Sequence, residues 1–102
     1  MKIVFHIAAL QEFRDERRYY NARGRGLGDR LIALVDSMLT EIARAPHSFP
    51  RDRKHPRARR ARIPGKFPHA LIIHVIEADD VVVLVALEHG RRRPGFWAKR
   101  LR

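Results

Sequence analysis

The pattern of apolar and polar positions at the start of the chain is typical of a strand followed by a helix. Lys2–His6 is a short run with high β propensity and predicts a first strand. In Ala8–Asn21 the apolar residues recur at Ala9, Phe13 and Tyr20, which share one face of a 3.6-residue period. We therefore expect a helix over this segment, with its charged residues in solvent.

The second helix has the clearest pattern in the chain. It begins near Leu27–Asp29 and ends before Pro46, which cannot continue a helix. Its apolar stripe consists of Leu27, Leu31, Leu34, Val35, Met38 and Ile42. The short Arg23–Gly26 segment contains two glycines and joins the helices, so we predict that they run antiparallel as a hairpin.

The remaining chain predicts a loop and three strands. Residues 46–58 contain three prolines and few apolar groups, which indicates a loop. Arg59–Ile63 alternates between apolar and basic positions, and His69–Glu77 is rich in β-branched residues. Val81–Leu87 is apolar at every position, which is typical of a central strand covered on both faces.

The element order β-α-α-β-β-β predicts a single α+β domain spanning residues 1–102. A helical hairpin packed on a mainly antiparallel four-stranded sheet is the simplest two-layer arrangement that covers the apolar face of such a sheet. With 45% hydrophobic residues, the chain has enough apolar side chains for one core.

Composition excludes several classes of protein. The chain has no cysteine, so it contains no disulfide framework, thiolate nucleophile or cysteine-ligated zinc. No apolar run approaches the roughly 20 residues of a membrane span, so we expect a cytoplasmic protein with no membrane partner. The net charge of +11 predicts an anionic partner, either nucleic acid or an acidic protein.

The positive charge is concentrated in two blocks. Residues 51–102 carry a net charge of +9, against +2 for residues 1–50, and residues 67–88 contain no Lys or Arg. The blocks run from Arg51 to Lys66 and from Arg91 to Arg102, and arginine predominates in both. Arginine offers a planar donor fork that suits phosphate and carboxylate groups. The alternative is that these blocks are solvated faces that keep a small protein soluble.

Several residues, in order, resemble the RelE/ParE superfamily of toxins from type II toxin–antitoxin systems, which includes plasmid stabilisation proteins. The match includes Tyr19-Tyr20, Gly26-Leu27-Gly28 before the second helix, and Phe67-Pro68-His69 after Arg62. Its most specific part is His-Gly-Arg-Arg-Arg-Pro-Gly-Phe-Trp at His89–Trp97, followed by Arg100. The chain departs from the family at His69, usually Tyr, and at Glu16, commonly Ala.

The resemblance implies a toxin that inhibits bacterial growth until a small acidic antitoxin neutralises it. The antitoxin would fold over the basic and apolar grooves of the toxin and form a hetero-oligomer with it. ParE-like members inhibit DNA gyrase, whereas RelE-like members are ribosome-dependent endoribonucleases that cut mRNA. A generic nucleic-acid-binding module remains a third interpretation, because it needs only the arginines.

The resemblance also assigns roles to individual residues. By this resemblance Arg60 and Arg62 stand where RelE-like members have strand lysines, and His69 and Arg91 stand near their strand and C-terminal arginines. All four would be catalytic only if the chain is a metal-independent ribonuclease. Trp97 takes the place of the catalytic Tyr, and an indole cannot donate a proton at neutral pH. His69 or His89 could then move the proton, because imidazole titrates near neutrality. The missing Tyr and the form of the C-terminal segment favour the ParE-like interpretation.

The residues expected to bind the target or the antitoxin are Arg60, Arg62, His89, Arg91, Arg92, Arg93, Trp97 and Arg100. Each also has a structural interpretation. The arginines could form solvated faces, His89 could be a hydrogen-bonded structural histidine, and Trp97 could close one end of the core.

No metal or other cofactor is expected. His69 and His74 lie five residues apart on one strand, so their side chains point to opposite faces of the sheet. Gly24–Gly28 superficially resembles a phosphate-binding loop, but no strand leads directly into it. A turn of the helical hairpin explains it better.

Overall fold

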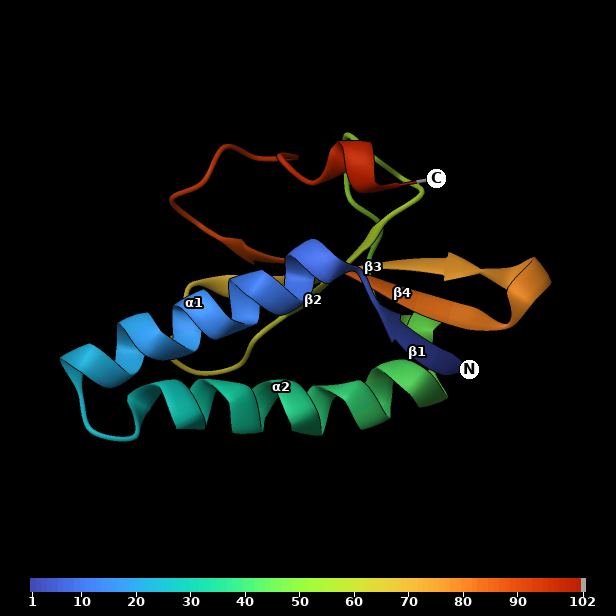
Figure 1. The fold of residues 1–102 in the computed structure, drawn as a ribbon. Helices are drawn as coiled ribbons and strands as arrows, with labels where there is room; N and C mark the ends of the chain where they lie inside the picture. The colour runs from blue at the N-terminus through green and yellow to red at the C-terminus, as the bar shows by residue number, and fades with distance from the viewer. Residues whose placement is uncertain (102) are drawn as a thin grey trace.

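The computed structural model describes residues 1–101 and places two helices on one face of a four-stranded sheet (Figure 1). The strands lie in the order β1-β4-β3-β2; β1 runs parallel to β4, and the other pairs are antiparallel. None of the described helices is both long and apolar enough to span a bilayer. The elements are β1 (Lys2–Phe5), α1 (Ile7–Arg23), α2 (Leu27–Arg44), β2 (Arg59–Arg62), β3 (His69–Ile76) and β4 (Val81–His89).

This architecture confirms the predicted α+β order and the central position of the apolar strand. The boundaries differ by one or two residues. Helix α1 ends at Arg23, two residues later than predicted, and β4 extends to His89 rather than Leu87. The extension places His89 opposite His69 in the β3–β4 pairing, which matters for the site described below.

The helices cover one face of the sheet. Phe13 of α1 and Leu31, Val35 and Ile42 of α2 pack against the side chains that β3 and β4 direct toward them. The apolar stripe of α2 therefore packs in the core, as the sequence indicates. Burial of apolar surface, worth about 25 cal/mol per Å², is the main contribution that stabilises this packing. The strand residues in this cluster are Leu71, Ile73, Val82, Leu84 and Leu87.

The opposite face of the sheet is covered by the C-terminal tail, residues 90–101, and this was missed by the two-layer prediction. Trp97 is fully buried there against Ile72, Val85 and Ala86. A β-bulge makes this possible, because the pairing shifts between Ile72 and Ile73 and gives β4 one extra residue. The tail thus forms a partial third layer, which Figure 1 shows on the side of the sheet away from α2.

The hairpin turn is closed by a side-chain cap on α2. Asn21 Oδ1 accepts hydrogen bonds from the backbone N–H of Gly28 at 2.7 Å and of Asp29 at 3.1 Å. These amides lie in the first turn of α2, where no helical carbonyl can reach them. The contact brings α1 so close to α2 that Gly28 has no room for a side chain.

We predict that Gly28→Ala destabilises the fold. The new Cβ would collide with the carbonyl oxygen of Arg17 and would lie 2.8 Å from Asn21 Oδ1, so the helices would have to separate. A loss of about 3 kcal/mol in the free energy of unfolding is expected in a denaturant titration. Gly24→Ala is the control, because its Cβ would make only ordinary contacts at 3.5 Å. Equal stability of the two variants would contradict the prediction.

Candidate functional site

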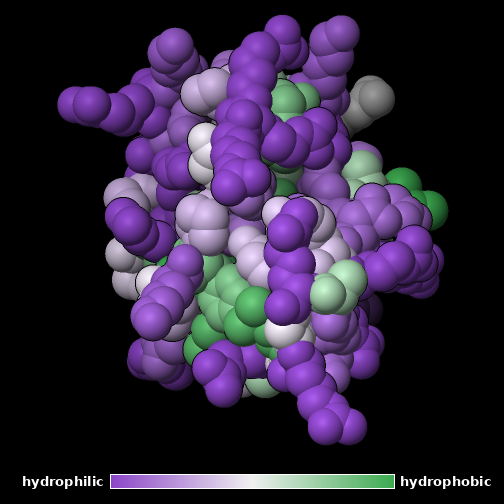
Figure 2. Space-filling view, turned by 90° about the vertical axis from the view of Figure 1, so that its left-hand side faces the viewer, coloured by the Kyte–Doolittle hydropathy of each residue, from purple (hydrophilic) through white to green (hydrophobic). Residues whose placement is uncertain are grey.

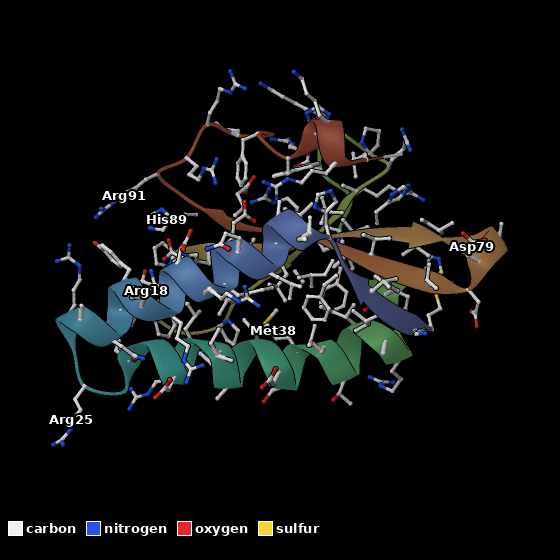
Figure 3. The ribbon with its side chains drawn as sticks, viewed as in Figure 1. Arg18, Arg25, Met38, Asp79, His89 and Arg91 are labelled. Atoms are coloured by element: carbon white, nitrogen blue, oxygen red, sulfur yellow. The ribbon has the colours of Figure 1, made fainter. Side chains whose placement is uncertain are left out.

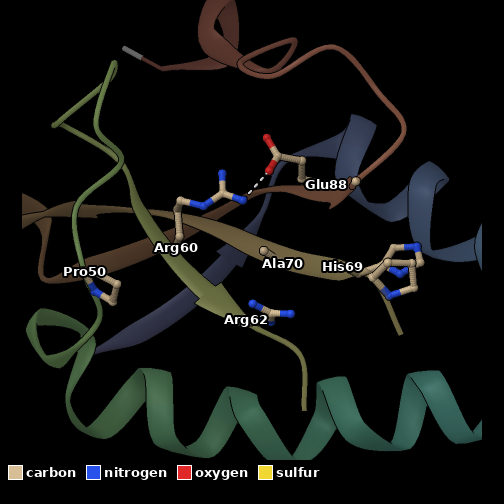
Figure 4. Close-up of a pocket in the computed structure, with 8 residues that line it drawn as sticks. Pro50, Arg60, Arg62, His69, Ala70 and Glu88 are labelled. Carbon is tan, nitrogen blue, oxygen red and sulfur yellow. Dashed lines mark ion pairs between the residues drawn. The ribbon is translucent and has the colours of Figure 1, made fainter. Parts of the chain in front are cut away.

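A cleft of about 390 Å³ lies at the β2 edge of the sheet, on the side covered by the tail (Figure 4). Alternation along β2 turns Arg60 and Arg62 toward this side, because Ala61 and Ile63 face the helices. The cleft therefore collects several of the residues expected to form a functional site. Its lining comprises Pro50, Arg60, Arg62, Pro68, His69, Ala70, Glu88 and Gly90.

Arg60 is not free to bind a ligand in this cleft. Its guanidinium forms an ion pair with Glu88, as the dashed line in Figure 4 shows, and lies 3.3 Å from Asp52 Oδ1. Glu88 is buried and also accepts a hydrogen bond from Trp97 Nε1 at 2.7 Å. Arg60 therefore neutralises a buried carboxylate that anchors the tail.

The assignment of Trp97 to a contact surface is wrong for this structure. The indole is fully buried, and its single N–H is engaged by Glu88. An aromatic face enclosed in this way cannot stack on a base or meet a partner. The packing interpretation explains the position of Trp97.

Arg92 and Arg100 also have structural partners. Glu12 of α1 accepts hydrogen bonds from Arg100 at 2.8 and 3.1 Å and from Arg92 at 3.4 Å. The same carboxylate accepts the backbone N–H of Leu87 at 3.0 Å, beside the bulge of β4. Both guanidinium groups also lie over the ring of Phe96. Glu12 thus fastens the tail to α1 and to the central strand.

Of the candidate arginines, three remain available to an outside partner: Arg62, Arg91 and Arg93. All three are exposed, and within residues 1–101 none of them forms an ion pair. Figure 3 shows Arg91 extending away from the body of the protein. We call these three residues the exposed arginine group.

Glu16, His69 and His89 form a cluster next to Arg91. Glu16 Oε2 of α1 lies 3.1 Å from Nε2 of His69, whose side chain is fully buried. The rings of His69 and His89 meet edge to face with centroids 4.6 Å apart. The two positions at which this chain departs from the family pattern, Glu16 and His69, are therefore in direct contact.

Hydrogen bonds fix the orientation of both rings in this arrangement. The backbone N–H of Arg91 donates to His89 Nδ1 at 2.8 Å, which requires the tautomer with its proton on Nε2. His69 donates Nε2–H to Glu16, and its Nδ1 is buried without a partner among residues 1–101. Burial lowers the pKa of His69 below its ordinary value of 6.5; His89 adds to this, and Glu16 opposes it.

His69 and His74 point to opposite faces of the sheet, as predicted. His69 faces Glu16 on the helix side, whereas His74 has a pKa lowered by burial and by Arg57 of the loop. Among the described residues, no group of three His, Asp or Glu side chains lies close enough to hold a metal ion.

A second hollow lies between the hairpin and the loop that follows β2. Its apolar lining comes from Tyr20, Leu27, Leu34 and Phe67, and Arg30 and Lys66 stand beside them. Figure 2 looks onto this end of the molecule and shows an apolar area surrounded by hydrophilic side chains. This combination suits an amphipathic segment that carries acidic residues.

Sequence reasoning missed the acidic members of the site. Glu12, Glu16 and Glu88 each hold basic or aromatic residues that the sequence had marked as candidates. Of these three residues, only Glu16 stands out in the sequence, because it departs from the family pattern. The other two read as ordinary charged positions, because their partners lie on distant elements.

The chain is similar to known toxins of type II toxin–antitoxin systems. The model of a family described as the ParE toxin of the type II toxin–antitoxin system parDE matches residues 3–94. The crystal structure of the isolated E. coli RelE toxin superposes with a TM-score of 0.62 at 18% identity, covering 99% of this chain and 98% of that chain. At this identity the superposition supports the fold. No curated protein is similar enough to count as a match.

We predict that Glu12→Ala loosens the tail and lowers the free energy of unfolding by about 2–3 kcal/mol. The change leaves the Leu87 amide and two guanidinium groups without their shared acceptor. Limited proteolysis should cleave the variant within residues 90–101 faster than the wild type. Asp15→Ala is the control on the same helix, because Asp15 is exposed and, among residues 1–101, accepts a hydrogen bond only from Gln11. Unchanged proteolysis of Glu12→Ala would refute the proposed fastening.

We also predict that acid destabilises the folded protein through its buried histidines. The folded-state pKa values of His69 and His74 lie below 6.5, so the unfolded chain binds protons more readily. The contribution of the neutral histidines to the free energy of unfolding is therefore fully present above about pH 6.5, and it decreases as the pH falls below that value. The urea concentration at the midpoint of unfolding should decrease when the pH is lowered from about 7.5 to about 5.5. In the variant His69→Gln/His74→Gln this decrease should be smaller. An equal decrease in the variant would count against this origin.

Proposed function

The chain belongs to the ParE toxin family of type II toxin–antitoxin systems, and on this basis we propose that it arrests bacterial growth by binding and inhibiting DNA gyrase. The exposed arginine group would contact the target. The protein would act in the cytoplasm, where gyrase works, and it would need no metal or other cofactor.

The observation that carries this proposal is the state of Trp97, which stands in place of the catalytic Tyr, and of the two histidines that could move a proton instead. Trp97 is enclosed, His89 accepts a backbone N–H, and His69 is buried against Glu16. Cleavage of RNA without a metal needs a group that takes a proton from the 2′-hydroxyl and one that protonates the leaving oxygen. The enclosure of these side chains among residues 1–101 supports binding over cleavage.

The proposed antitoxin is a small acidic protein. A net charge of +11 attracts such a partner over a distance of about a Debye length, roughly 8–10 Å at moderate salt. The hollow of Tyr20, Leu27, Leu34 and Phe67 offers an apolar contact, and Arg30 and Lys66 offer adjacent cations. An antitoxin bound here and over the exposed arginine group would form a hetero-oligomer in which the target is excluded.

Ribosome-dependent mRNA cleavage is the second candidate function. The cleft at β2 supports it, because Arg62 and Gly90 line the same cavity and bring the strand close to the start of the basic tail. Arginines in such an arrangement could stabilise a phosphorane. This function would require His69 or His89 to give up the hydrogen bonds described above.

We predict that expression of the chain alone arrests growth and that the purified protein inhibits DNA supercoiling by gyrase. Co-expression of the small acidic protein encoded by the neighbouring open reading frame should restore growth. Replacing the exposed arginine group as Arg62→Ala/Arg91→Ala/Arg93→Ala should weaken inhibition about tenfold or more, because three unpaired cations are lost. Primer extension on cellular mRNA should reveal no new ends.

The matched control is Arg25→Ala/Arg44→Ala/Arg53→Ala, which removes the same charge from exposed positions elsewhere. It should inhibit supercoiling as the wild type does. If new mRNA ends appear at ribosomal A-site positions while gyrase still supercoils DNA, gyrase inhibition is refuted and the ribonuclease function is supported. Normal growth at confirmed expression of folded protein would refute both.

A further inference from the structure

The loop that leads into β2 and the C-terminal tail lie side by side on the face of the sheet away from the helices (Figure 1). The rings of His55 and Trp97 meet edge to face with centroids 5.2 Å apart, and Ala58 packs in the same apolar cluster as Trp97. A Cβ on Gly95 would lie only 2.8 Å from His55 Nε2, so the two segments are in close contact. We call these segments, residues 50–58 and 90–101, the outer layer.

The outer layer contains a single acidic residue, Asp52. Its side chain is only 13% exposed and forms an ion pair with Arg60. The same carboxylate accepts the backbone N–H groups of Lys54 and His55 at 3.1 and 2.9 Å, which fixes the turn of the loop. The one carboxylate of the layer is thus used internally and does not repel an anion that approaches from solvent.

Four cations of the outer layer face solvent and belong neither to the exposed arginine group nor to the contacts that fasten the tail. All four are exposed, and within residues 1–101 none of them forms an ion pair. Because like charges on one surface repel each other, an anionic ligand would relieve this repulsion. We call these residues the outer basic face: Arg53, Lys54, Arg57 and Lys99.

The loop that carries three of these cations is held in one conformation. The guanidinium of Arg51 donates to the carbonyl of Pro56 at 2.8 Å, and the N–H of Asp52 donates to the carbonyl of Ala58 at 2.8 Å. A loop that is already ordered loses little conformational entropy when it binds a ligand. The outer basic face therefore presents its charges from a fixed backbone.

The absence of apolar anchors indicates which kind of anion fits this face. None of the exposed large hydrophobic side chains among residues 1–101 belongs to the outer layer, whereas protein interfaces are centred on buried apolar and aromatic anchors. Trp97 is buried, and Phe96 lies under the guanidinium of Arg92, so neither ring is open to stack on an unpaired base. A purely cationic surface suits the phosphate backbone of a duplex, which binds by charge neutralisation.

We propose that the outer basic face binds the phosphate backbone of duplex DNA. Each of its guanidinium and ammonium groups would meet phosphate oxygens and release the counterions held there. Contacts of this kind position a protein on DNA without reading its sequence. The activity goes beyond gyrase inhibition and needs no gyrase, but it would concentrate the toxin on the substrate of that enzyme.

The test measures binding of the purified protein to a short mixed-sequence DNA duplex by fluorescence anisotropy, between about 50 and 200 mM salt. Lys54→Ala/Arg57→Ala/Lys99→Ala removes cations from both segments of the layer. Its Kd should rise about tenfold or more at moderate salt, and the slope of log K against log salt should become shallower by roughly 2–3, or about 0.9 per lost phosphate contact. The variant should fold, because all three positions are exposed, and circular dichroism checks this.

Two control variants separate a located face from the net charge of the chain. Arg18→Ala/Arg25→Ala/Arg30→Ala removes the same charge from exposed positions of the helical hairpin and should keep the salt slope of the wild type. Lys54→Arg/Arg57→Lys/Lys99→Arg keeps every charge of the face and should also bind like the wild type, because backbone phosphates accept either cation.

Four results would overturn the proposal. An unchanged Kd of Lys54→Ala/Arg57→Ala/Lys99→Ala would show that the face does not contact DNA. An equal loss in the helical-hairpin control would assign binding to net charge alone. Tighter binding to a single strand than to the duplex would assign the face to unpaired nucleic acid, and stronger binding to polyglutamate would assign it to an acidic protein. Gyrase inhibition is tested with other residues, so either proposal can fail without the other.

Discussion

The carboxylate of Glu12 is the contact on which the arrangement of the basic tail depends. It lies on α1, accepts the amide of Leu87 on the central strand and binds the guanidinium groups of Arg92 and Arg100. One side chain thus joins a helix, the sheet and the tail. Because Arg92 and Arg100 are used in this way, Arg91 and Arg93 are left to face solvent on a fixed segment.

Glu88 and Glu16 also join residues from different elements of the fold. Glu88 holds Arg60 and the buried indole of Trp97, and Glu16 holds the buried ring of His69. Glu88 is buried and Glu16 is partly buried, and each carboxylate has cationic or N–H partners, as a desolvated charge requires. The positive charge of the chain therefore has two uses. Part of it fixes the tail internally, and part of it is presented to a partner.

Local patterns were sufficient for most of the fold. Helix α2 and strand β4 have the predicted positions, because the 3.6-residue stripe and the uninterrupted apolar run record how each element is buried. The third layer was not predicted, because the tail reads as polar surface and few of its residues, Phe96, Trp97 and Leu101, pack against the sheet. The assignment of Trp97 to a contact surface failed for the same reason.

The sequence by itself determined the element order, the family resemblance and the positions of the basic blocks, since these follow from residues close together in the chain. Only the tertiary structure decided which arginines remain free. Arg60 and Arg62 are equivalent by pattern, yet Arg60 meets Glu88 from a distant strand while Arg62 is exposed. An ion pair between residues 28 positions apart depends on how the sheet is assembled, and no local period records it.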